Sequence, residues 1–142
     1  MQKKYLALDV GTTTLGIAYS DVLGIIHGVE NFHFDKNQFI VARKHFKEVA
    51  ERIGIKDVVV GLPCYPSGDP SPMTSIATRF VEDLKKENPE INFEFEDEQY
   101  TTNEAHEELS SRRVSSKKRK ASVDKIAACF ILEHYLQRKG LY

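Results

Sequence analysis

Three acidic residues that lie far apart in the chain occupy positions where carboxylates are unusual. Asp9 ends an apolar run, although aspartate is a poor strand residue. Glu98 closes a second strand-like run, in which three consecutive residues (96–98) are acidic. Asp124 falls on the apolar side of a helical pattern, together with Ala128 and Ile131. Carboxylate oxygens are preferred ligands of Mg²⁺ and Mn²⁺. If the three converge, they form a divalent-metal site that can activate water and stabilise the leaving oxygen of a phosphodiester.

Each carboxylate also has a structural interpretation that needs no chemistry. Asp9 could cap the end of its strand through an Asx turn. The acids around Glu98 could form a solvated charge cluster. Asp124 could be a first-turn acid that interacts with the helix dipole. The dipole does not explain why Asp124 lies on the apolar side, where an unpaired carboxylate is costly.

A basic strip precedes Asp124 in an otherwise acidic chain. Residues 110–120 hold six basic side chains and no acid, whereas the rest of the chain holds 14 basic and 21 acidic residues. The serines between them predict a flexible loop that binds phosphates and does not specify base sequence; a solvated helix connector is the alternative. The side chains expected to bind nucleic acid are Arg113, Lys117, Lys118, Arg119 and Lys120.

Periodicity predicts the elements that must position these residues. Apolar or alternating runs predict strands over residues 5–10, 15–20, 25–34, 57–61 and 91–98. Helical spacing predicts helices over residues 38–53 and from Pro72 to Asn88, with Gly54 and Ser71 as caps. Two further helices are expected, one from Thr102 or Asn103 to about Arg113 and one over residues 123–138.

The connections predict an α/β fold. Short joins make the first three strands antiparallel neighbours, and helical crossovers make the last two parallel to the first. The result is a mixed five-stranded sheet flanked by about four helices, in a single domain over residues 1–142. Asp9 and Glu98 then lie at the same carboxyl edge of the sheet, and Asp124 is expected to open the helix that packs over that edge.

Five spaced motifs together resemble one family. In order they are Leu8-Asp9-Val10-Gly11-Thr12, Gly61-Leu62-Pro63, Asp97-Glu98 with Thr101-Thr102, Ser116-Lys117-Lys118-Arg119-Lys120, and Val123-Asp124-Lys125-Ile126-Ala127-Ala128. The set resembles the YqgF (RuvX) family of ribonuclease-H-like proteins, described as Holliday junction resolvases and as nucleases for pre-16S rRNA.

The resemblance implies a ribonuclease-H-like fold and a hydrolase that leaves a 5′-phosphate. It implies that Asp9, Glu98 and Asp124 are the catalytic residues and the ligands of Mg²⁺ or Mn²⁺. The chain departs from the family at Gln99, where Arg is usual, and in the loop over residues 64–68. The three carboxylates are intact, so the departures bear on substrate contacts more than on cleavage.

We therefore expect a metal-dependent endonuclease that processes the 5′ end of pre-16S rRNA. The alternatives are a Holliday junction resolvase acting on four-way DNA and a non-catalytic nucleic-acid-binding module. The run from Asp9 to Thr14 also resembles the phosphate loop of actin-like ATPases, which would indicate a nucleotide-binding fragment.

Composition narrows the class of protein. The chain is 41% hydrophobic and 29% charged, with no apolar run long enough for a membrane span. Its two cysteines have neither zinc-site nor disulfide-framework spacing. These features predict a cytoplasmic protein without a membrane partner. Paired cuts in a junction would need a symmetric dimer, and we expect a monomer or weak homodimer.

Overall fold

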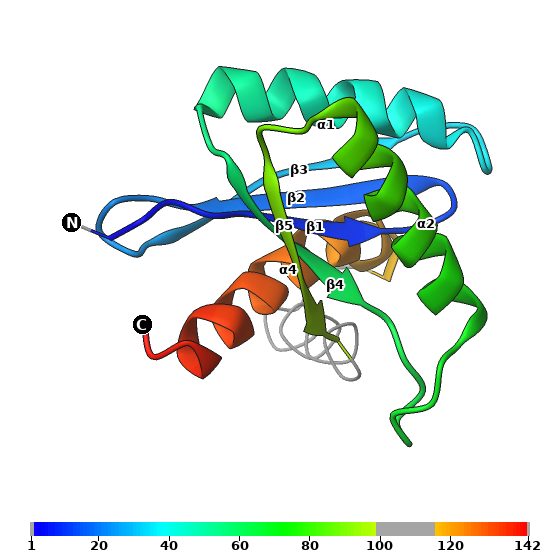
Figure 1. Cartoon of the computed structure of the whole chain (residues 1–142). Coiled ribbons are helices and arrows are strands. Elements are labelled where there is room, and N and C mark those ends of the chain that lie inside the picture. Colours follow the sequence, from blue (N-terminus) through cyan, green and yellow to red (C-terminus); the bar gives the residue numbers. More distant parts are fainter. Residues whose placement is uncertain (1, 99–115, 142) are drawn as a thin grey trace.

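The computed structural model describes residues 2–98 and 116–141, and within the last helix it describes side chains from Lys125 onward. The strands are β1 (Leu6–Val10), β2 (Thr14–Ser20), β3 (Ile26–His33), β4 (Asp57–Leu62) and β5 (Asn92–Asp97). The described helices are α1 (Phe39–Ile53), α2 (Pro72–Glu87) and α4 (Ser116–Arg138). Figure 1 shows α1 and α2 on one face of the sheet and α4 on the other.

The sheet confirms the predicted mixed topology. Its strand order is β3-β2-β1-β4-β5. The pairs β1–β2 and β2–β3 are antiparallel, as their short connections require, whereas β1–β4 and β4–β5 are parallel. The carboxyl ends of β1, β4 and β5 therefore meet at one edge of the sheet, where α/β proteins commonly bind their ligands.

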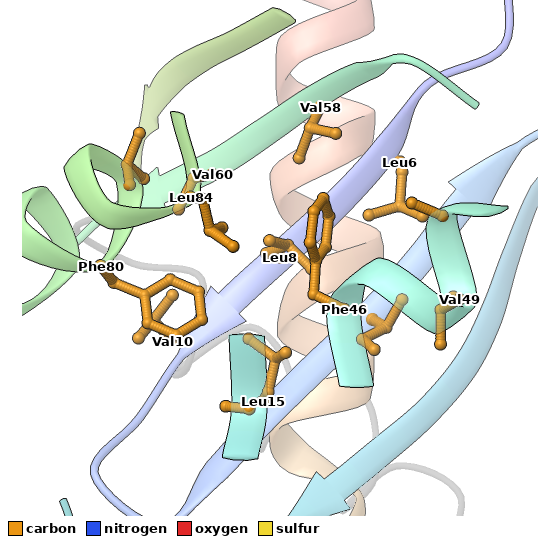
Figure 2. Close-up of a cluster of buried hydrophobic side chains, with 14 of the residues drawn as sticks. Leu6, Leu8, Val10, Leu15, Phe46, Val49, Val58, Val60, Phe80 and Leu84 are labelled. Carbon is orange, nitrogen blue, oxygen red and sulfur yellow. The ribbon is translucent and has the colours of Figure 1, made fainter. Parts of the chain in front are cut away.

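The larger core lies between the sheet and the pair α1 and α2 (Figure 2). Leu6, Leu8 and Val10 point to this face because alternate residues of a strand share a side. Phe46 of α1 is fully buried among them, and Phe80 of α2 packs nearby. The apolar residues that recur at helical spacing in α1 and α2 are the ones that pack against this face of the sheet.

The second core lies under α4. Ala7, Ala18 and Val59 supply the sheet side, and α4 packs against these mostly small side chains with Ala128 and Ile131. Small residues on the strands allow the helix to approach the sheet closely. The odd-numbered residues of β1 therefore face α4.

Local capping interactions set the end of α1 and the start of α2 where the sequence predicts them. Gly54 adopts the left-handed conformation (φ 74°), and its N–H donates to Ala50 O at 2.8 Å, which closes α1. Ser71 and Thr74 form a reciprocal capping box ahead of α2, with Pro72 at its first turn. These local interactions explain why both boundaries were predictable.

The final helix begins earlier than predicted. α4 starts at Ser116, not at residue 123, so residues 116–120 are helical and the predicted flexible loop is wrong for this part of the basic strip. Lys, Arg and Ala are good helix formers, and of the serines that suggested a loop only Ser116 lies within the helix. Asp124 consequently stands in the third turn of the helix and does not open it.

Other predictions fall beyond the described residues. The helix expected from about residue 102 to Arg113 lies there, as do Arg113 itself and Gln99. Within the described ranges, no helix combines the length and apolar character that a bilayer crossing requires.

Candidate active site

Asp9 lies at the carboxyl end of β1, on the face covered by α4. Its neighbours Leu8 and Val10 point to the larger core, whereas Ala7 packs beneath α4, so alternation places Asp9 with Ala7. The residue is buried, with 9% of its surface exposed. A carboxylate buried on a packed face is costly unless hydrogen bonds or a cation compensate its charge.

Glycines stand on both sides of Asp9 in the sheet. Gly16 of β2 pairs with it directly. Gly61 of β4 lies beside it on the other strand, because the register aligns Leu8 with Val60 one residue earlier. With no side chain at either glycine, the sheet leaves room around the Asp9 carboxylate.

Glu98 occupies part of that room. It follows β5 directly, and its backbone N–H donates to Leu62 O at 3.4 Å. A Cβ placed on Gly61 would lie 2.6 Å from Glu98 Oε2 and 2.8 Å from Glu98 Cδ. The Glu98 carboxylate therefore lies directly over Gly61, next to the strand that carries Asp9, and its Oε2 is shielded from solvent. The structure thus brings two of the three predicted carboxylates to one face and one edge.

The position of Asp124 is consistent with this arrangement, although its side chain lies outside the described part. In α4 it stands one turn before Ala128 and two turns before Ile131. Ile131 Cδ1 lies 2.5 Å from the Cβ position of Gly61, so this face of α4 passes over the site. The backbone position of Asp124 is on the same face of the helix.

Two hydrogen bonds fasten the end of α4 to β5. Arg138 Nε donates to Glu96 Oε1 at 2.7 Å, and the Tyr135 hydroxyl donates to Glu94 Oε2 at 2.6 Å. The hydrogen bond from Tyr135 lowers the pKa of the Glu94 carboxyl, and burial raises the pKa of the Tyr135 hydroxyl. Glu94 and Glu96 lie on the same face of β5 as Glu98, which directly follows the strand. These contacts therefore hold in place the strand that leads to Glu98.

The donor set suits a hard divalent cation. Asp9 and Glu98 offer carboxylate oxygens, and the missing Cβ at Gly61 leaves the space that the Glu98 carboxylate occupies. Among the described side chains, no group of three or more His, Cys, Asp or Glu residues is placed to bind a metal. The side chain of Asp124, the third expected ligand, lies outside the described side chains.

The described part of the basic strip, residues 116–120, occupies the first turns of α4. Residues 117–120 precede Asp124 by one to two turns. These residues therefore belong to the helix that covers the site, whereas the prediction made them part of a flexible loop.

The sequence did not indicate that Glu98 packs over Gly61 or that Asn31 lies in the same row of the sheet as Asp9. A glycine within the β-branched run of β4 was itself a signal, because it often marks a close approach to the backbone. Asn31 of β3 pairs with Gly16 and so joins the row of Asp9, with its Oδ1 buried. No pattern in the sequence indicated Asn31. The register between β2 and β3 shifts between Ile17 and Ala18, so simple alternation along β3 does not tell which face Asn31 takes.

The chain is similar in sequence to bacterial proteins that share one description. A protein of Leuconostoc citreum, called "Putative pre-16S rRNA nuclease", is 37% identical over 141 residues and aligns over 96% of each chain. A protein of the same description from Geobacillus sp. (strain WCH70) is 36% identical over 139 residues, covering 96% of this chain and 99% of its own.

Solved structures show the same fold at lower identity. RuvC of T. thermophilus, in complex with a Holliday junction substrate, superposes with a TM-score of 0.59 at 15% identity. The superposition covers 99% of this chain and 98% of that chain. This likeness confirms the predicted ribonuclease-H-like architecture. The RuvX family model, described as Holliday junction resolvase, matches residues 3–138, and this chain therefore belongs to that family.

Proposed function

We propose that this protein is a metal-dependent endonuclease that processes the 5′ end of pre-16S rRNA. The observation that carries the proposal is the Glu98 carboxylate over Gly61, on the same face and at the same edge as the buried Asp9. Two relatives described as "Putative pre-16S rRNA nuclease" are 36–37% identical to this chain, and the alignments cover nearly the whole length of each protein. The proposal includes a cytoplasmic site of action.

Asp9, Glu98 and Asp124 would hold Mg²⁺ or Mn²⁺. Bound there, the ion supplies an activated water and charge stabilisation for the leaving oxygen of the phosphodiester. Gly61 and the hydrogen bond to Leu62 O position the Glu98 carboxylate. This pre-organisation matters because hydrolysis gains most from groups already placed for the transition state.

The basic strip would bind the phosphate backbone. Residues 117–120 carry four positive charges on the helix that also carries Asp124. Contacts of this kind set the position of the nucleic acid and leave base sequence unread. Recognition of the cleavage position must therefore come from another part of the protein.

The test compares three carboxylate variants with a matched control. Asp9→Asn, Glu98→Gln and Asp124→Asn should each abolish Mg²⁺-dependent cleavage of a 5′-labelled pre-16S fragment and weaken Mn²⁺ binding measured by calorimetry. RNA binding in EDTA should be largely retained. Asp57→Asn removes a carboxylate at the opposite end of β4, where it pairs with Lys3, and should cleave normally. Normal cleavage by the three carboxylate variants would refute the site.

A four-way DNA junction is the competing substrate, because the family description names Holliday junction resolvase. Matched RNA and junction substrates should be compared under single-turnover conditions, together with the mass of the protein in solution. Preference for the junction, with paired cuts by a dimer, would replace the RNA proposal. Binding of both substrates with no cleavage in any divalent ion would indicate the non-catalytic module.

A further inference from the structure

Tyr65 exposes an aromatic ring in the loop that follows β4. It lies in the β4–α2 loop (residues 63–71), which leaves the sheet at the same edge as Glu98 (Figure 1). Half of its surface is exposed. Packing in the core is thereby excluded for this residue. The ring is therefore accessible to a partner, and tyrosine suits such contacts because its ring is apolar and its hydroxyl is polar.

The loop is ordered by its own hydrogen bonds. Tyr65 N donates to Asp69 O at 2.9 Å, and Gly68 N donates to Tyr65 O at 2.7 Å. The Ser67 hydroxyl donates to Asp69 Oδ2 at 3.0 Å. Gly68 allows the turn because it adopts φ 90°, in the left-handed region. The ring is therefore presented from a preformed turn, which lowers the entropy lost when it binds a partner.

The base of the loop is tied to the site. Leu62 O accepts hydrogen bonds from both Glu98 N (3.4 Å) and Cys64 Sγ (3.6 Å). On the other side, the Thr74 hydroxyl donates to Pro63 O and joins the loop to the start of α2. Tyr65 is three residues beyond Leu62, so the backbone places it within about 10 Å of the sheet edge.

The loop offers a stacking surface without positive charge. Residues 63–71 contain neither Lys nor Arg, and Asp69 is the charged residue among them. Elsewhere in the described chain, Tyr5 packs on Tyr135 and Tyr19 on His27, so those tyrosine rings are already used. The β4–α2 loop thus complements the basic strip, which can hold phosphates and has no aromatic residue.

We propose that Tyr65 stacks on an unpaired base next to the scissile phosphate and selects substrates that are single-stranded there. Within a duplex both faces of a base are covered by its neighbours, whereas an unpaired base can present a face to an aromatic ring. This inference rests on the proposed nuclease function, since that function puts nucleic acid at the edge of the sheet. It adds a requirement for local single-stranded structure.

Binding of a labelled single-stranded RNA in EDTA tests the contact without cleavage. Tyr65→Ala should weaken binding about 5- to 160-fold, as for loss of one base stack. Tyr65→Phe should bind like the wild type because it keeps the ring. The slope of affinity against salt should stay unchanged, since no phosphate contact is lost. Leu23→Ala is the matched control, because Leu23 is 73% exposed in the turn after β2, at the opposite edge.

An abasic scan locates the partner. RNAs that lack one base at successive positions around the cleavage site should include one that binds the wild type weakly. Tyr65→Ala should be insensitive to that same abasic site. If the wild type distinguishes no abasic position, or if Tyr65→Ala binds as the wild type does, the stacking inference is overturned.

The experiments distinguish failure of the Tyr65 stacking inference from failure of the nuclease proposal. Tyr65-dependent binding without cleavage in any divalent ion would support the stacking contact and refute the nuclease proposal. Metal-dependent cleavage that is indifferent to Tyr65, with duplex and single-stranded sites cut equally, would do the opposite. Absence of RNA binding by the wild type would overturn both.

Discussion

Substitution of Gly61 by alanine probes the link between the fold and the candidate site. The added Cβ would lie 2.6 Å from Glu98 Oε2 and 2.5 Å from Ile131 Cδ1. Carbon atoms in contact are normally about 3.5–4.0 Å apart, so each neighbour must move by roughly 1 Å. The two displacements have different consequences, one for activity and one for stability.

Activity should fall because the Glu98 carboxylate is displaced. A misplacement of about 1 Å in a catalytic constellation lowers the rate about 100-fold. We expect this loss in kcat under single-turnover conditions, with RNA binding in EDTA close to wild type. Mn²⁺ affinity should fall as well, because Glu98 is an expected ligand.

Stability should fall because Ile131 is fully buried and cannot move freely. Insertion of a methyl group into a packed core costs about 1–3 kcal/mol. Thermal and denaturant unfolding would measure this loss. Ile131→Val removes the clashing Cδ1 atom, so Gly61→Ala combined with Ile131→Val should recover part of the stability while kcat stays low.

Gly54→Ala is the matched control for a destabilised but active protein. Gly54 has φ 74°, and a Cβ there would meet nothing within 4 Å. The left-handed backbone should cost about 1–2 kcal/mol without touching the site. A Gly61→Ala variant with wild-type kcat, or one whose kcat is restored by Ile131→Val, would show that Gly61 does not position Glu98.

Three further predictions concern the core, the strip and the sheet–helix contact. Phe46→Ala should lower the free energy of unfolding by about 3–5 kcal/mol, measured by urea denaturation, because the ring is fully buried. Replacement of residues 117–120 by glutamine should weaken RNA binding and reduce the slope of log affinity against log salt by about 0.7 for each lost single-strand phosphate contact; an unchanged slope would argue against the strip. Tyr135 lowers the pKa of Glu94 in the folded protein, so that contact stabilises the fold above the unfolded pKa of Glu94 and is lost as pH falls through its folded pKa. Tyr135→Phe should therefore lose stability at neutral pH and show a shallower decline in unfolding free energy under acid conditions; a decline equal to that of the wild type would contradict this assignment.

Local patterns determined much of the fold. Helical stripes, the cap at Gly54 and the Ser71-Pro72 start predicted α1 and α2, because these signals act within a few residues of chain. Short joins predicted the antiparallel strands, and the apolar run of β4 predicted its place inside a parallel sheet. The edge shared by Asp9 and Glu98 followed from strand direction alone.

The tertiary structure decided what surrounds those carboxylates. The run before Asp9 is apolar throughout, so alternation within it could not tell which face Asp9 would take. The contact of Glu98 with Gly61, the passage of Ile131 over the same glycine and the Arg138–Glu96 bond join residues far apart in sequence. Such contacts depend on how helices and strands pack, and packing is set by the shapes of many side chains together, which no local pattern encodes.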